Sequence, residues 1–250
     1  MALGICQLCG QRTEIINSHI WPRFAYKRYV SDLKKGGQFL DLQTGNTNAQ
    51  KQYTLPWFCE SCDRDVLGKK EKYAAEFCDM LEKRPTEEHS YDGRLLSFAV
   101  SISWRTVKSC WKARGSNGDD PAHTASQRWK DYLRGKKQNL GPFTQHLFIV
   151  FDRDAALHKG LGGGVFAAER LVLSQIGPLF IIGLLDRKHI PVADLDVWSH
   201  SKLSEEGGTV TPISAWRVGT EITMDCARFL ARHDTAIKTR MFEMVHQSRR

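Results

Sequence analysis

The sequence predicts an α+β fold in two parts, a small metal-binding module followed by a mixed α/β domain. Two Cys-x-x-Cys pairs lie near the start of the chain, and a helical pattern follows the second pair. Further helical patterns come next, and then short apolar runs bounded by glycine, proline or aspartate, which are typical of buried strands. We therefore expect the module over residues 1–82 and the second domain over residues 83–250.

Composition restricts the class of protein. The chain has 250 residues, enough for one large domain or two ordinary ones, and is 41% hydrophobic and 26% charged, as folded soluble proteins are. No apolar run approaches the roughly 20 residues of a membrane-spanning helix, and the first residues lack the basic and apolar regions of a secretory signal. We expect a cytoplasmic protein with no membrane partner.

The net charge of +8 favours a polyanionic partner. Lysine and arginine side chains release counterions when they neutralise phosphates, and this gives affinity for nucleic acid that does not depend on its sequence. Many basic proteins bind no nucleic acid, so the charge by itself leaves both interpretations open.

Four cysteines predict one structural zinc site. In a reducing compartment Cys-x-x-Cys pairs bind metal more often than they form disulfides, and four thiolates complete the tetrahedron that zinc prefers, with no position left for water or substrate. Gly10 suits the tight turn of a zinc knuckle, and a helix after the second knuckle is expected of a treble clef. The alternative is two unrelated cysteine pairs. The expected ligands are Cys6, Cys9, Cys59 and Cys62.

Two further elements are expected in the module. Residues 31–56 are polar and rich in glycine and asparagine, which predicts a loop or hairpin between the knuckles. After the second knuckle, apolar residues return at helical intervals from Val66 to Leu81. Gly68 interrupts this helix, at a cost of about 1 kcal/mol relative to alanine.

The second domain is expected to mix helices and strands. A long helix with one apolar face is predicted over Gly93–Ala113, and the polar stretch 114–125 is interpreted as a linker before a further helix over 125–134. The glycine-rich segment 157–165 lacks the Gly-Lys-Ser/Thr ending of a phosphate-binding loop and is interpreted as a flexible turn. Strands are expected at Gln145–Phe151 and Leu179–Leu185, and an amphipathic helix at Thr223–Val245.

The order of the motifs resembles a known family. Cys6-x-x-Cys9 is followed by Ser18-His19-Ile20-x-Pro22 and then by Cys59-x-x-Cys62-Asp63. This order is similar to that of zinc-bearing HNH endonucleases, in which Cys-x-x-Cys precedes Asp-His-Ile-x-Pro and a Cys-x-x-Cys-His motif follows. The resemblance covers residues 5–78 and implies a ββα-metal treble clef of the HNH type.

A narrower likeness involves residues outside those motifs. The stretch Ser18–Lys27, Glu71 and Ser103-Trp104-Arg105 resemble an uncharacterised group of bacterial HNH-like proteins, often associated with mobile or defence islands. That likeness implies a role in phage defence or in a mobile element, with a protein partner in a larger complex. Trp104-Arg105 is also expected to form a packed or paired site between helices.

The resemblance implies roles for particular residues. His19 becomes the general base that activates water, beside a Mg²⁺ or Mn²⁺ ion that neutralises charge on a phosphate of DNA. Asp63 takes the place of the last histidine and Glu71 lies eight residues further on, so both are candidate oxygen ligands. Ser18 stands where a carboxylate or imidazole is usual, and the middle asparagine has no clear counterpart, Thr54 being nearest by count.

Each of these candidates has a structural alternative. His19 could bond the knuckle backbone, Asp63 could be a favourable charge at a helix N-terminus, and Glu71 could be a solvated helix residue. Among cations, the candidate phosphate contacts are Arg23, Lys27 and Arg28. Neighbouring aromatic side chains would either stack on bases or form a small core. These aromatic residues are Trp21, Phe24 and Tyr26.

Three functions are therefore weighed. The leading hypothesis is a metal-dependent HNH-like endonuclease that hydrolyses nucleic-acid phosphodiester bonds, with DNA as its substrate. The second is a non-catalytic, zinc-dependent nucleic-acid-binding module, motivated by Ser18, Asp63 and the missing asparagine. The third is an adaptor subunit of a larger complex, in which the zinc module is a scaffold.

Overall fold

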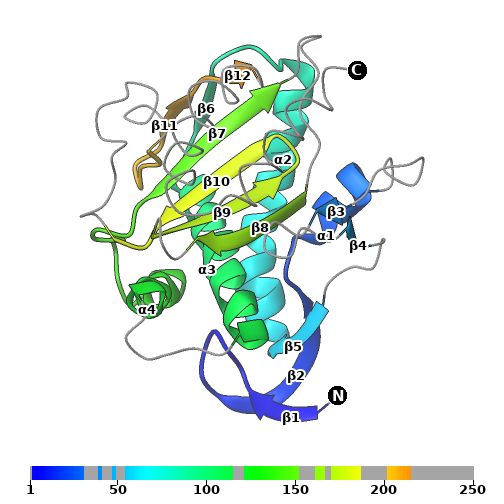
Figure 1. Cartoon of the computed structure of the whole chain (residues 1–250), viewed down its shortest axis with the longest axis vertical. Helices are drawn as coiled ribbons and strands as arrows, with labels where there is room; N and C mark the ends of the chain where they lie inside the picture. Colours follow the sequence, from blue (N-terminus) through cyan, green and yellow to red (C-terminus); the bar gives the residue numbers. More distant parts are fainter. Residues whose placement is uncertain are drawn as a thin grey trace.

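The protein has a mixed α+β fold in which one long helix packs against a five-stranded sheet and a three-stranded sheet lies towards one end of that helix (Figure 1). This computed structural model describes residues 2–30, 39–40, 47–48, 54–114, 121–151, 161–166, 170–186 and 202–214. The predicted helix Thr223–Val245 lies outside the described residues. Within the described part, no helix is both long and apolar enough to cross a membrane.

A three-stranded antiparallel sheet forms the first part of the chain. Its order is β1 (Ala2–Ile5), β2 (Arg12–His19) and β5 (Thr54–Phe58). Between β2 and β5, the short strands β3 (Phe39–Leu40) and β4 (Thr47–Asn48) pair with each other, within the segment that was expected to be a loop or hairpin.

Helical structure follows both β2 and β5. The short helix α1 (Arg23–Ala25) continues into a π-helical turn at Tyr26–Val30. After β5, a second π-helical turn at Cys62–Gly68 leads into α2 (Lys69–Lys83). Gly68 therefore marks a junction between two helical geometries instead of a break. A Cβ atom there would lie 3.3 Å from the carbonyl oxygen of Asp63, so glycine allows the wider turn to close tightly.

The second sheet has five strands, in the order β12-β7-β10-β9-β8. All its neighbouring strands are antiparallel except β12 and β7, which are parallel. A two-stranded pair of β6 (His89–Tyr91) and β11 (Gly208–Val210) lies apart from this sheet. The strands of the sheet are β7 (Gln145–Phe151), β8 (Leu161–Phe166), β9 (Leu171–Ile176), β10 (Leu179–Leu184) and β12 (Ile213–Ser214).

The long helix α3 (Gly93–Arg114) matches the prediction, and α4 (Pro121–Leu133) begins earlier than expected. Proline is favoured in the first helical turn, so Pro121 starts a helix inside the stretch that was interpreted as a linker. The strands β7 and β10 also match their predicted ranges.

The glycine-rich segment was interpreted wrongly in part, because residues 161–166 form strand β8 instead of a flexible turn. Its glycines permit close packing: a Cβ atom at Gly163 would lie 2.7 Å from Cη2 of Trp21 and 2.7 Å from the carbonyl oxygen of Leu173. Glycine in a strand often marks such an approach.

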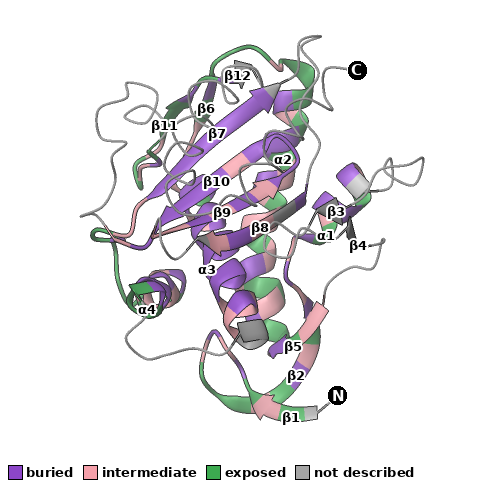
Figure 2. Cartoon of the chain, viewed as in Figure 1, coloured by how far each residue is buried: buried purple, intermediate pink, exposed green. Residues whose placement is uncertain are grey.

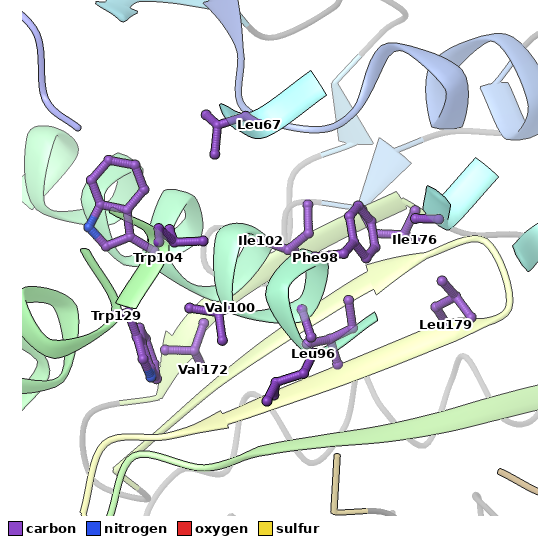
Figure 3. Close-up of a cluster of buried hydrophobic side chains, with 14 of the residues drawn as sticks. Leu67, Leu96, Phe98, Val100, Ile102, Trp104, Trp129, Val172, Ile176 and Leu179 are labelled. Carbon is purple, nitrogen blue, oxygen red and sulfur yellow. The ribbon is translucent and has the colours of Figure 1, made fainter. Parts of the chain in front are cut away.

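One hydrophobic core joins the two predicted parts of the chain. Helix α3 contributes buried side chains to this core, and Figure 2 shows this helix and the strands in front of it as largely buried. In Figure 3, Leu67 lies on the side of α3 that faces the first part of the chain, whereas Val172, Ile176 and Leu179 lie on the side of the five-stranded sheet. The predicted domain boundary at residue 82 falls at the end of α2, but the hydrophobic core includes residues on both sides of this boundary.

Candidate metal centre and its surroundings

Four cysteines from three segments meet at one end of the first sheet. Cys6 and Cys9 lie in the turn between β1 and β2, Cys59 follows β5, and Cys62 begins the π-helical turn. Their four Sγ atoms all lie within 4.8 Å of one another, and Cys9 Sγ is 4.0 Å from Cys59 Sγ. Tetrahedral zinc with bonds of about 2.3 Å would place its sulfur ligands about 3.8 Å apart. This cluster could hold a metal ion.

Backbone hydrogen bonds fix the turn that carries the first pair. Gly10 has a φ of +79°, and its N–H donates to the carbonyl oxygen of Cys6 at 2.8 Å. The N–H of Gln7 donates to the carbonyl oxygen of Trp57 at 2.9 Å, which ties the turn to β5. The hydrogen-bonded contact between strands β2 and β5 thus helps to bring the two cysteine pairs together.

The thiols differ in acidity. Burial raises the pKa of Cys6, but backbone N–H groups, including that of Cys59 at 3.5 Å from Cys6 Sγ, outweigh it and lower the pKa to about 7. Burial and neighbouring thiols raise the pKa of Cys62, and burial also raises that of Cys59. One thiolate therefore forms readily near neutral pH, and a bound cation would favour deprotonation of the others.

His19 lies at the opposite end of β2 from the cysteines. It pairs with Thr54 across β2 and β5, so the residue nearest by count to the middle asparagine stands directly opposite the histidine. The imidazole is partly buried, with its centroid 6.2 Å from the ring centroid of Tyr26. The preceding Ser18 is fully buried and its Oγ donates to the carbonyl oxygen of Ile16 at 3.5 Å.

A buried arginine links the Glu71 carboxylate to the backbone of His19. Nη1 of Arg105 donates to Oε1 of Glu71 at 2.7 Å and to the carbonyl oxygen of His19 at 3.2 Å. The Arg105 side chain is 2% exposed and that of Glu71 is 21% exposed. Further bonds run from Nε to the carbonyl oxygen of Ser101 at 3.3 Å and from Nη2 to the Ser101 hydroxyl at 3.4 Å. The guanidinium thus joins β2, α2 and α3.

Asp63 does not belong to that group. It directly follows Cys62, its backbone N–H donates to the carbonyl oxygen of Cys59 at 3.0 Å, and it therefore lies at the cysteine end of the helical segment. Eight residues separate it from Glu71, which is on the order of 10 Å along a helix. Among the residues that the structure describes, the four cysteines are the one group of three or more His, Cys, Asp or Glu side chains close enough to hold a metal.

The candidate phosphate contacts differ in their surroundings. Arg23 and Lys27, four positions apart, are both exposed. Arg28 instead pairs with Asp79 and, at 3.3 Å, with Glu82. Its use as a phosphate contact remains a prediction, and it would require these ion pairs to break.

The neighbouring aromatic residues serve the core. Tyr26 is 5% exposed, and the ring centroid of Phe24 lies 6.3 Å from that of Phe98 on α3. Trp21 is partly buried with its ring over Gly163 of β8. These contacts favour the structural interpretation of the three aromatic residues over base stacking.

The sequence pointed to Arg105 but not to its partner. Trp104 of α3 stacks on Phe58 of strand β5 with ring centroids 5.7 Å apart. The paired site between helices comes from Arg105 of α3 and Glu71 of α2. Arg105 could be found from the sequence because it is a charged residue next to the apolar stripe of α3. No local sequence pattern indicates that it pairs with Glu71, 34 positions earlier.

Comparison with protein-family models, with curated proteins and with solved structures found no match for this chain.

Proposed function

We propose that this protein is a zinc-stabilised, HNH-like treble-clef protein that binds nucleic acid, DNA in the first instance, without cutting it. One observation carries the proposal. The Glu71 carboxylate is ion-paired with the buried Arg105, which also bonds the backbone of His19. Asp63 lies beside Cys62, eight residues before Glu71. Among the residues that the structure describes, a second divalent ion beside His19 would therefore lack the oxygen ligands that it requires.

The cysteine cluster supports zinc as the metal. Four soft thiolates at tetrahedral spacing match zinc better than hard cations such as magnesium, which prefer oxygen. A knuckle between β1 and β2, followed by a helical segment that begins at the second pair, supports the treble clef. Because all four ligands come from the protein, this ion would hold the structure and would not activate water.

Exposed cations on neighbouring helices support nucleic-acid binding. Arg23 and Lys27 are exposed on the helical segment after β2. Helix α1 contacts α2, whose first turn exposes Lys69 and Lys72. Together with the net charge of +8, these side chains offer contacts to phosphates that require no base recognition.

A binding titration tests the proposal. Anisotropy of a labelled DNA duplex, measured from low to moderate salt, should give a linear fall of log K with log salt. The variants Arg23→Ala and Lys27→Ala should each reduce the slope by about 0.9 if each contacts one phosphate. Arg84→Ala is the matched control, since Arg84 is an exposed arginine that pairs with Glu87. No binding at low salt would refute the proposal, and a stable protein complex on purification would then favour the adaptor.

Endonuclease activity is the second candidate, favoured by Arg105, which bonds both the Glu71 carboxylate and the backbone carbonyl of His19. A supercoiled plasmid incubated with Mg²⁺ or Mn²⁺ would be nicked if this candidate is right. Cleavage by the wild type that is lost in His19→Ala would establish it and overturn the non-catalytic proposal. Cleavage that survives His19→Ala would point to a contaminating nuclease or to other residues.

A further inference from the structure

Two lysines and two aromatic rings form a cluster on helices α3 and α4, which we call the α3–α4 amine cluster: Lys108, Trp111, His123 and Lys130. Nζ of Lys108 lies over the Trp111 ring, 5.4 Å from its centroid. The Trp111 ring in turn stacks on His123, with centroids 5.6 Å apart and an interplanar angle of 28°. None of these residues belongs to the cysteine cluster or to the group around Arg105.

The chain fixes the cluster through the packing of the two helices. Lys108 and Trp111 are three positions apart on α3, and His123 and Lys130 are two turns apart on α4, so each pair lies on one helix face. Beside them, α4 buries a stripe that includes Ala122, Ala125 and Trp129 against the rest of the protein. The positions of the amines are therefore set by rigid elements instead of by a loop.

Within the described ranges, the two lysine charges of this cluster have no carboxylate partner. Burial lowers the pKa of Lys108, and the nearby charge of Lys130 lowers it further. The carboxylate of Asp131, next to Lys130 in sequence, instead accepts a hydrogen bond from the Gln127 side chain. Two partly buried like charges without a counterion destabilise a fold, and an anion would relieve that cost.

We propose that the α3–α4 amine cluster binds a phosphate group, and that in the functional complex this phosphate belongs to the backbone of the bound DNA. The ammonium groups supply charge and hydrogen-bond donors for a phosphodiester, and an imidazole N–H adds a further donor. The Trp111 ring already carries His123 and Lys108, so it positions these donors and does not act as a platform for bases. The choice of nucleic acid as the source of the phosphate rests on the proposed function, whereas the anion site itself does not.

Lysine methyl signals can test the site directly in the full-length protein. Reductive methylation with ¹³C-formaldehyde keeps the charge and gives one NMR signal for each lysine, and Lys108→Arg and Lys130→Arg assign the two signals of interest. Inorganic phosphate and a DNA duplex of about 20 base pairs, enough to span the cluster, are titrated separately. The exposed Lys136 is the control amine.

Saturable movement of the Lys108 and Lys130 signals with either probe, while the Lys136 signal stays in place, is the expected result. Movement with phosphate alone would keep the anion site but remove nucleic acid as its source. If neither probe moves the two signals, the inference is overturned, even for a protein that binds DNA elsewhere and so retains the proposed function.

A second measurement guards against indirect effects of methylation. Lys108→Met keeps the stem and removes the charge, so it should lower the salt slope of duplex binding by about 0.9. The same substitution should raise the melting temperature, because it removes a half-buried charge that pairs with no carboxylate among the described residues. Lys136→Met should change neither quantity. An unchanged salt slope in Lys108→Met would contradict contact between this amine and the duplex.

Discussion

The ion pair between Glu71 and Arg105 allows a sharp test of the proposed function, because the proposal that the protein does not cut DNA depends on this pair. Replacing Glu71 by glutamine leaves the Arg105 charge with no described carboxylate partner, although its side chain is only 2% exposed. Removing one partner of a buried pair typically costs 3–5 kcal/mol. The Glu71 side chain keeps 21% of its surface exposed, so water can partly replace it, and we expect Glu71→Gln to lower the free energy of unfolding by about 2–3 kcal/mol.

The double variant Glu71→Gln/Arg105→Met separates the pair from its surroundings. A buried ion pair replaced on both sides by uncharged groups of similar volume is often nearly neutral, so the double variant should be more stable than Glu71→Gln alone. Urea unfolding at neutral pH measures all three free energies. Glu87→Gln is the control, since its pair with Arg84 is about half exposed and should be worth less than 1 kcal/mol.

A small effect would refute this reasoning. If Glu71→Gln costs no more than Glu87→Gln, the Glu71 carboxylate is not needed to neutralise Arg105. It would then be available to a divalent ion beside His19, and the endonuclease would become the better supported function.

Three further predictions follow from the same contacts. Removing the metal with a chelator, or the substitution Cys62→Ser, should unfold the protein. Structural zinc contributes about 10–16 kcal/mol in small zinc domains, which is as much as the total stability of many folds. Circular dichroism measures the unfolding, and the zinc content is measured in parallel. Gly177→Ala should cost about 2–5 kcal/mol, because its Cβ would lie 2.2 Å from Cζ of Tyr29 and φ there is +56°. Burial raises the pKa of Cys78 from 9.0 to about 11, so stability that is present below pH 9 should be lost as pH rises towards 11, and urea unfolding of wild type and Cys78→Ala should show the difference.

Each of these predictions has a matched control. Cys110→Ala changes a buried cysteine outside the cluster, so retained zinc content is expected there, and a chelator that leaves the wild type fully folded would contradict a structural metal. Gly135→Ala meets a positive φ of +71° but no atom within 4 Å, so it should cost about 1–2 kcal/mol, and an equal cost for Gly177→Ala would exclude the clash. Parallel pH profiles for wild type and Cys78→Ala would remove that thiol from the alkaline loss.

Local chemistry made much of the structure predictable. The cysteine pairs could be found because two ligands three positions apart are a signal within one turn, and their meeting needs only strands β2 and β5 to pair. The long helix α3 and strands β7 and β10 could be found because apolar periodicity persists over their whole length.

Contacts between distant segments could not be predicted in the same way. Strand β8 was interpreted as a turn because its glycines have no preference for strands, and the reason for them is the Trp21 ring that lies against Gly163. Glu71 has the same local pattern as a solvated helix residue, and the buried Arg105 that pairs with it becomes visible only when α2 packs on α3. Tertiary contacts, instead of propensity, decided both cases.

The shared core makes α3 the element through which the two parts of the chain can affect each other. Phe58, one residue before Cys59, stacks on Trp104, and the adjacent Arg105 holds Glu71. Lys108 lies one turn further along the same helix. The unfolding expected on loss of the metal would therefore include α3, the helix that also positions the α3–α4 amine cluster. On this basis zinc would affect nucleic-acid binding through packing, without any contact between the metal and the bound DNA.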